Sequence, residues 1–111
     1  MELTKLSPQL SVRPQLLPEE VAQLAEAGFK GIINNRPDNE APDQPRSSEI
    51  EAEAKRHGLV YRYIPIVPGS ATEDDVQAFA AALREAGGPV VAFCRTGNRS
   101  TQLFNAAQKL A

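Results

Sequence analysis

Short apolar runs alternate along this chain with longer stretches in which apolar residues recur at helical spacing. The runs at residues 31–34, 59–66 and 90–94 contain many β-branched or aromatic side chains, which indicates buried strands. Residues 3–12 alternate weakly around Ser7 and Pro8, and this pattern predicts a short edge strand or a hairpin.

A helix is predicted between each of these runs and after the last one. Pro18 and the two glutamates after it open the first helix, and Gly28 ends it. The second helix spans residues 47–57, and Thr72 followed by three acidic residues caps the third. The expected inward-facing residues are Val21, Leu24, Ala25, Ile50, Ala54, Val76, Phe79, Ala80, Leu83, Leu103, Phe104, Ala107 and Leu110.

The order of elements predicts an α/β fold. Apolar strands that are separated by helices form a mostly parallel sheet with helices on both faces, because each strand must be covered on two sides. We therefore expect a three-layer sandwich with four to five strands, built by residues 1–111 as a single domain. Residues 36–45 hold three prolines and little apolar character, and so predict a loop.

Composition narrows the possible functions of this domain. The 111 residues carry a formal net charge of −2 and no basic stripe, which argues against a nucleic-acid partner. No apolar stretch is long enough for a membrane span, and no leader precedes the first strand, so we expect a cytoplasmic protein that does not bind membranes. One cysteine and one histidine are too few for a usual metal site, and no cofactor is expected.

The single cysteine, Cys94, is the most informative residue. It ends an apolar strand, and the polar loop after it runs into a predicted helix. Backbone N–H groups and the helix dipole at such a place favour an anion, and Arg95 and Arg99 add two full charges. This setting lowers the pKa of a thiol and holds an anion beside the sulfur.

A purely structural interpretation of the same residues remains open. A lone cysteine is more often a small buried apolar residue, and a strand-to-helix turn often needs a glycine. Two arginines within five residues of Cys94 have no packing purpose, however, and Gly97 lets the backbone approach a ligand closely. The convergence of these features favours a nucleophile site.

The loop resembles those of two enzyme families. Tyrosine and dual-specificity phosphatases have His-Cys, five residues, and then Arg followed by Ser or Thr. Here Phe93 stands in place of that histidine, four residues separate Cys94 from Arg99, and Ser100 occupies the position of the phosphatase arginine. The shorter loop is similar to that of rhodanese-like sulfurtransferases, whereas the order of elements is similar to that of dual-specificity phosphatases.

A third resemblance covers nearly the whole chain, from about Leu6 to Lys109. Residues 32–40, 63–66 and 94–100 look like the corresponding segments of the phosphatase-like domain of the beta-lactamase-hydrolase-like family. Members resemble dual-specificity phosphatases in fold and are often fused to, or encoded beside, sulfur dioxygenases. The resemblance therefore implies bacterial sulfide and persulfide metabolism, with this chain as a stand-alone form and a sulfur dioxygenase as a possible partner.

The reaction type depends on a general acid. Hydrolysis of a phosphate ester needs an acid for the departing alkoxide, and Pro68 stands near where the aspartate of dual-specificity phosphatases would fall. Asp38 is the possible acid from another loop. Sulfur transfer makes no such demand, since its leaving group is already a stable anion. We therefore favour a sulfurtransferase, with a phosphatase and a non-catalytic anion-binding module as alternatives.

Each candidate site residue has an expected role. Cys94 is the nucleophile and sulfur carrier, and the Arg99 side chain binds the oxygens of a small sulfur or phosphate anion. The acceptor is a thiol such as glutathione. Asn35 and Arg36 form a second wall of the pocket, or simply end a strand. The Ser100 hydroxyl is expected to bond the thiolate. Cross-sheet packing explains Tyr61 and Tyr63. The backbone N–H groups that we expect to surround the anion are those of Arg95, Thr96, Gly97, Asn98 and Arg99.

Overall fold

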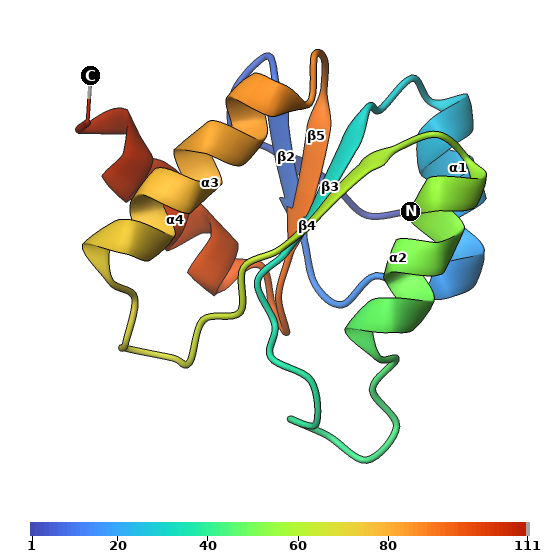
Figure 1. Cartoon of the computed structure of the whole chain (residues 1–111), viewed down its shortest axis with the longest axis horizontal. Helices are drawn as coiled ribbons and strands as arrows, with labels where there is room; N and C mark the ends of the chain where they lie inside the picture. Colours follow the sequence, from blue (N-terminus) through green and yellow to red (C-terminus); the bar gives the residue numbers. More distant parts are fainter. Residues whose placement is uncertain (111) are drawn as a thin grey trace.

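The computed structural model describes residues 1–110. Within them, five strands form one sheet in the order β1-β2-β5-β3-β4 (Figure 1). β1 runs antiparallel to β2, and the other neighbouring pairs are parallel. The strands are β1 (Thr4–Lys5), β2 (Leu10–Arg13), β3 (Gly31–Asn34), β4 (Val60–Tyr63) and β5 (Val90–Phe93).

Helices cover both faces of this sheet (Figure 1). A 3-10 turn (Pro18–Glu20), α1 (Val21–Glu26) and α2 (Ser47–Arg56) lie on one face. On the other face, α3 (Glu73–Glu85) and α4 (Asn98–Gln108) pack against each other. The predicted α/β fold, a three-layer sandwich around a mostly parallel sheet, is confirmed. No helix within residues 1–110 is long and apolar enough to cross a membrane.

The central strand β5 serves a separate apolar core on each side. Val90 and Ala92 face the core under α3 and α4, which is built around Phe79. Val91 and Phe93 face the core under α1 and α2. Successive side chains of a strand point to opposite faces, so a strand covered on both sides must be apolar throughout. This explains why the sequence shows an unbroken apolar run there.

α3 begins where its capping pattern predicts. The Thr72 hydroxyl accepts a hydrogen bond from the Asp75 backbone N–H at 3.1 Å, and the Asp75 carboxylate accepts one from the Thr72 N–H at 2.9 Å. These reciprocal bonds satisfy two backbone donors that a helix start would otherwise leave unpaired. Glu73 and Asp74 are the first two residues of the helix, and both are exposed.

Three details differ from the sequence-based expectations. The first residues do form a hairpin, but Leu10–Arg13 is an interior strand because it also pairs with β5. β4 spans Val60–Tyr63 and is shorter than residues 59–66, although the N–H groups of Ile64 and Ile66 still donate to the carbonyls of Asn34 and Asn35. Leu110 is 47% exposed rather than inward-facing, since α4 ends at Gln108.

The strand register gathers the polar residues at one edge. Arg13 of β2 and Asn34 of β3 both pair with Phe93, the last residue of β5. The residues that follow these strands therefore meet at the carboxyl edge of the sheet, where parallel α/β folds bind their ligands. Asn35, Arg36 and Cys94 all lie at this edge.

Candidate active site

Cys94 lies at the bottom of a backbone cradle. It follows β5 directly, and its side chain is fully buried. The Gly97 N–H donates a hydrogen bond to Sγ at 3.0 Å. Burial of the thiol raises its pKa, but hydrogen bonds from backbone N–H groups outweigh this effect, so the pKa of Cys94 lies below its ordinary value. The donors are the N–H groups of Ser100, Thr96, Arg99 and Gly97.

Gly97 makes this cradle possible. Its φ of 95° lies in the left-handed region that side chains disfavour, and it is the N-cap residue of α4. A Cβ atom at this position would lie 3.4 Å from the backbone carbonyl of Arg13. The glycine thus turns its N–H toward Cys94 while it packs closely against β2.

The cradle residues around Gly97 differ in exposure. Arg95, Thr96 and Asn98 are exposed, so they border the solvent side of the loop. The Thr96 hydroxyl accepts a long hydrogen bond of 3.3 Å from the Asn98 N–H. The exposed Arg95 adds a positive charge to the solvent side of the loop. The cradle itself is therefore formed by backbone, as a loop in front of a helix N-terminus allows.

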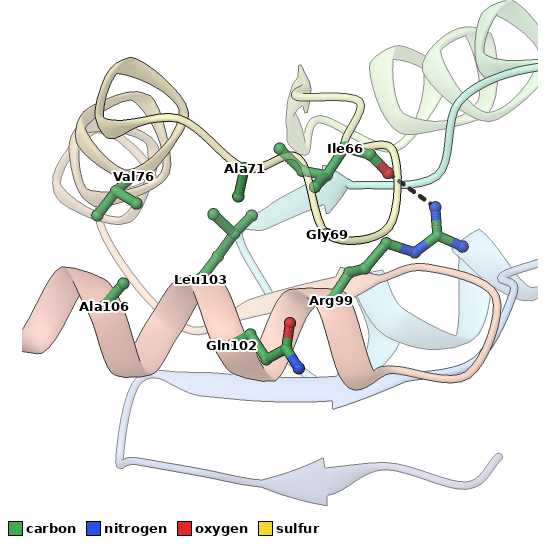
Figure 2. Close-up of a pocket in the computed structure, with 8 residues that line it drawn as sticks. All are labelled: Ile66, Gly69, Ala71, Val76, Arg99, Gln102, Leu103 and Ala106. Atoms are coloured by element: carbon green, nitrogen blue, oxygen red, sulfur yellow. Dashed lines mark hydrogen bonds between the residues drawn. The ribbon is translucent and has the colours of Figure 1, made fainter.

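Arg99 links the Cys94 loop to two other loops. Its side chain, 10% exposed, donates two hydrogen bonds to the carboxylate of Glu40 at 2.8 and 2.9 Å. It also donates to the carbonyl of Ile66 at 2.8 Å (Figure 2). The pKa of Arg99 lies above its usual value, chiefly through the hydrogen bonds to Glu40 and also through attraction to the Cys94 thiolate. An internal carboxylate thus occupies the guanidinium fork that was expected to bind substrate oxygens.

Glu40 is the important residue that sequence reasoning missed. Its carboxylate also accepts a hydrogen bond from Arg36 Nε at 3.0 Å, so it bridges two arginines. The hydrogen bond with Arg99 is the largest cause that lowers the pKa of Glu40, and Arg36 adds to it against the opposing effect of burial. The spacing of Arg36 and Glu40 is the one local signal of this pair. Glu40 is therefore held as a carboxylate beside the Cys94 loop.

Arg36 is buried and has a second partner. It is 6% exposed, and its Nη1 donates to the Gln15 side-chain oxygen at 3.0 Å. Its backbone N–H donates to the side chain of Asn34 at 2.9 Å. Arg36 thus lies at the carboxyl edge of the sheet, where the sequence predicts it, and it contacts Glu40 instead of standing free for a ligand.

Asn35 and Ser100 connect the Cys94 loop to the sheet by hydrogen bonds. The Asn35 backbone N–H donates to Phe93 at 2.8 Å, and its side-chain amide donates to the Ile64 carbonyl at 2.9 Å. The Ser100 hydroxyl donates to the Asn35 side-chain oxygen at 2.8 Å. Both residues are fully buried. The expected hydrogen bond from the Ser100 hydroxyl to the thiolate is therefore replaced, since its proton points to Asn35, and Ser100 acts on Cys94 through its backbone N–H.

Asp38, the possible general acid, is held by other contacts. Its carboxylate accepts a hydrogen bond from the Ser47 N–H at 2.7 Å, at the start of α2. Its own N–H donates to the Tyr63 hydroxyl at 2.9 Å. The Tyr61 hydroxyl lies 2.6 Å from the Ser47 hydroxyl and accepts a bond from Asn34 at 3.0 Å. The two tyrosines therefore do more than pack, because the Tyr63 hydroxyl holds Asp38 and the Tyr61 hydroxyl holds the start of α2 at Ser47.

The positions of side chains that could hold a metal ion also bear on the chemistry of the site. Among residues 1–110, no cluster of three histidine, cysteine, aspartate or glutamate side chains has the geometry of a metal site. The reactive features at this edge of the sheet are the buried thiol, its backbone donors and the three-way contact among Arg36, Glu40 and Arg99.

Curated proteins that resemble this chain in sequence share one description. A beta-lactamase hydrolase-like protein of Xylella fastidiosa is 36% identical to this chain over 104 residues, which cover 94% of the chain and 24% of that protein. A protein of the same description from Agrobacterium fabrum is also 36% identical over 104 residues. The chain thus spans about a quarter of the length of these relatives.

Solved structures share the fold over most of the chain. One from Neisseria meningitidis, described as a candidate phosphatase, has a TM-score of 0.82 and 35% identity, and the match covers 90% of this chain and 71% of that one. Another candidate phosphatase, from Shewanella putrefaciens, has a TM-score of 0.82 and 26% identity, with coverage of 96% and 66%. The sequence model of the family "Beta-lactamase hydrolase-like protein, phosphatase-like domain" matches residues 2–111. This chain belongs to that family of phosphatase-like domains.

Proposed function

We propose that this domain is a cysteine-dependent sulfurtransferase that moves a sulfane sulfur from a small anionic donor to a thiol. The observation that supports the proposal is the state of the carboxylates on the loops that follow β3 and β4. Glu40 is bound to two arginines, Asp38 is bound at the start of α2, and residues 67–72 contain no acidic side chain. A reaction whose leaving group needs no proton suits such a site.

In the first step, the Cys94 thiolate attacks the outer sulfur of thiosulfate or of a persulfide. A new S–S bond forms to Cys94, and the old S–S bond breaks with its electron pair on the departing sulfite or thiolate. The lowered pKa of Cys94 supplies the nucleophile, and the backbone N–H groups of the loop stabilise the anionic group beside it. Cys94 then carries a persulfide.

In the second step, an acceptor thiolate attacks the outer sulfur of that persulfide. The bond to Cys94 breaks, Cys94 returns to its thiolate form, and the acceptor leaves as a persulfide. Glutathione is one thiol to be tested as acceptor, and a sulfur dioxygenase is a protein that could consume the product. Neither step requires a metal or an organic cofactor.

Phosphate ester hydrolysis is the second candidate, and the comparisons favour it. The family is described as phosphatase-like, and the solved structures with 35% and 26% identity are described as candidate phosphatases. The same cradle suits phosphate oxygens, with Cys94 attacking phosphorus and water later releasing the phosphate. The departing alkoxide would need a proton, and the loss of a general acid typically costs about 10²–10⁴-fold in rate. Glu40, held as a carboxylate, is a poor donor of that proton.

The test is a pair of assays on the protein and its Cys94→Ser variant. One assay follows persulfide formation from thiosulfate with a thiol acceptor, together with a mass increase of one sulfur atom on Cys94. The other follows the hydrolysis of p-nitrophenyl phosphate and of an alkyl phosphate, whose leaving group is much more basic. Circular dichroism checks that the variant is folded.

Cys94-dependent sulfur transfer, with weak hydrolysis confined to the nitrophenyl ester, is the result we expect. Rapid hydrolysis of the alkyl phosphate without persulfide formation would instead establish the phosphatase. If neither activity depends on Cys94 while sulfate still binds, the domain is an anion-binding module.

A further inference from the structure

A groove lies beside Arg99, between α4, α3 and the segment that joins β4 to α3 (Figure 2). Its volume is about 240 Å³. Apolar atoms form the larger part of the walls, and polar atoms form the rest. The walls are lined by the side chains of Ile66, Ala71, Val76, Leu103 and Ala106.

Arg99 is shared by the groove and the Cys94 loop. Arg99 lines the groove, and its guanidinium donates to Glu40 and to the Ile66 carbonyl and is attracted to the Cys94 thiolate. Residue 66 is likewise shared, since its carbonyl binds Arg99 while the residue lines the groove. A molecule whose reactive end lies at Cys94 therefore has this groove as the adjoining place for the rest of its structure.

The chemistry of the walls selects the occupant. Among the lining residues of the groove, Arg99 is the single charged one and Gln102 the single neutral amide. Glutathione carries two carboxylates and an ammonium group, which would lose water against mostly apolar walls without matching partners. An aliphatic chain, in contrast, gains free energy in proportion to the apolar area that it buries.

We propose that this groove binds the aliphatic part of the substrate whose sulfur or anionic group reacts at Cys94, so that the preferred thiol or persulfide is an apolar one. This inference rests on the proposed function for the identity of the reacting group. The groove itself can be tested without any turnover.

The first test is equilibrium binding of unbranched alkanesulfonates, from methanesulfonate to hexanesulfonate, measured by calorimetry. Their sulfonate group suits the cradle, and their chain length is the variable. Affinity should rise by about two- to fourfold for each added methylene until the groove is filled, because complete burial of one CH₂ is equivalent to about fourfold. Affinity that is independent of chain length would overturn the proposal.

Matched variants locate the binding. Ala71→Leu on the exposed loop and Ala106→Leu on α4 both fill the groove, so each should abolish the chain-length dependence. Asn105→Leu adds the same side chain at an exposed position of α4 outside the groove and should keep the dependence. If the two groove variants bind hexanesulfonate as the unaltered protein does, the chain lies elsewhere and the proposal is wrong. Two filling variants are used so that the misfolding of one does not decide the result.

The second test uses sulfur transfer to mercaptoethanol, mercaptopropanol and mercaptobutanol, with glutathione as the polar comparison. We expect KM to fall with chain length in the unaltered protein and in Asn105→Leu, and to stay level in Ala71→Leu. The loading of Cys94 with sulfur from thiosulfate, followed by mass, should be equal in the unaltered protein and in Asn105→Leu. Absence of loading contradicts the proposed function alone, whereas normal loading with glutathione as the best acceptor contradicts the groove proposal alone.

Discussion

Two loops meet at the carboxyl edge of the sheet, and they are built in different ways. Residues 94–100 turn backbone N–H groups toward a buried thiol, and their shape depends on Gly97. Residues 36–46 instead contribute charged side chains, with Glu40 bound to Arg36 and across to Arg99. Backbone donors are fixed by the fold, whereas an ion pair at a partly exposed carboxylate can exchange its partner. We infer that the first loop determines where an anion lies and the second determines how readily it enters.

Replacement of Arg99 should have the largest effect, because this side chain connects the two loops. In Arg99→Lys, a single ammonium group cannot donate in parallel to two oxygens and also reach the Ile66 carbonyl. We expect kcat/KM to fall by about 10²-fold, as for the loss of one donor to a developing anion. Steady-state kinetics of whichever reaction depends on Cys94 measures this, with Arg56→Lys on the exposed face of α2 as the control. A change within about threefold, smaller than the loss of one neutral hydrogen bond, would remove Arg99 from the mechanism.

The backbone loop can be tested at its glycine. Gly97→Ala places a side chain at a φ of 95° and against the carbonyl of Arg13, so the free energy of unfolding should fall by about 1–2 kcal/mol. Turnover should also fall by about tenfold, the equivalent of the ~1 kcal/mol or more that one hydrogen bond contributes. Denaturant unfolding and steady-state kinetics provide the two measurements.

Gly28→Ala is the matched control for this variant. Gly28 has a φ of 92° after α1, with nothing within 4 Å of the position of an added Cβ. The free energy of unfolding of Gly28→Ala should fall by a similar amount to that of Gly97→Ala, while its turnover should stay unchanged. If both variants lose turnover equally, the activity of Gly97→Ala reflects general stability, and the special role of the cradle is contradicted.

The difference between the loops also explains what the sequence could predict. The Cys94 loop is encoded by adjacent residues, so the strand, the glycine and the following helix could be identified together. That the donors are backbone N–H groups follows from local geometry, because a strand that runs into a helix exposes N–H groups there. The expected set was only partly right: Ser100 donates in addition, while the Asn98 N–H bonds the Thr96 hydroxyl. The Ser100 hydroxyl was misjudged since its partner, Asn35, lies 65 positions away.

The second loop was less predictable for a physical reason. Asp38 and Glu40 stand two residues apart on a proline-rich segment, and Asn39 between them has a φ of 68°. That left-handed turn decides which carboxylate meets the Cys94 loop, and composition alone does not reveal it. The contact of Glu40 with Arg99 joins residues 59 positions apart, which no local pattern encodes. The roles of the Tyr61 and Tyr63 hydroxyls were missed for the same reason.

Removal of the Glu40 charge should have a smaller effect, of the opposite sign. In Glu40→Gln, the Arg99 fork no longer holds an internal carboxylate, so sulfate should bind about two- to fivefold more tightly, the equivalent of up to ~1 kcal/mol for a partly exposed ion pair. Calorimetric titration with sulfate measures the change. Glu51→Gln, which removes a carboxylate paired with Lys55 on α2, is the control and should leave the affinity unaltered. Weaker sulfate binding in Glu40→Gln would mean that Glu40 positions Arg99 and does not compete with the anion.

The pH dependence of stability should give the smallest effect, and its sign follows from the lowered pKa of Cys94. The pKa of Cys94 is lower in the folded protein than in the unfolded chain, where a thiol has a pKa of about 8.5. Between these two pKa values the unfolded chain binds more protons, so stability rises with pH in that window. The contribution is complete above the unfolded value and is lost as the pH falls through the folded one. Thermal unfolding of the protein and of Cys94→Ser across this range measures the difference in stability.

Because the backbone donors and not Glu40 are the cause of the lowered pKa, the rise in stability should persist in Glu40→Gln and be absent from Cys94→Ser. A rise that disappears in Glu40→Gln would show that the two loops act on the thiolate together, and the separation of their roles would then be wrong.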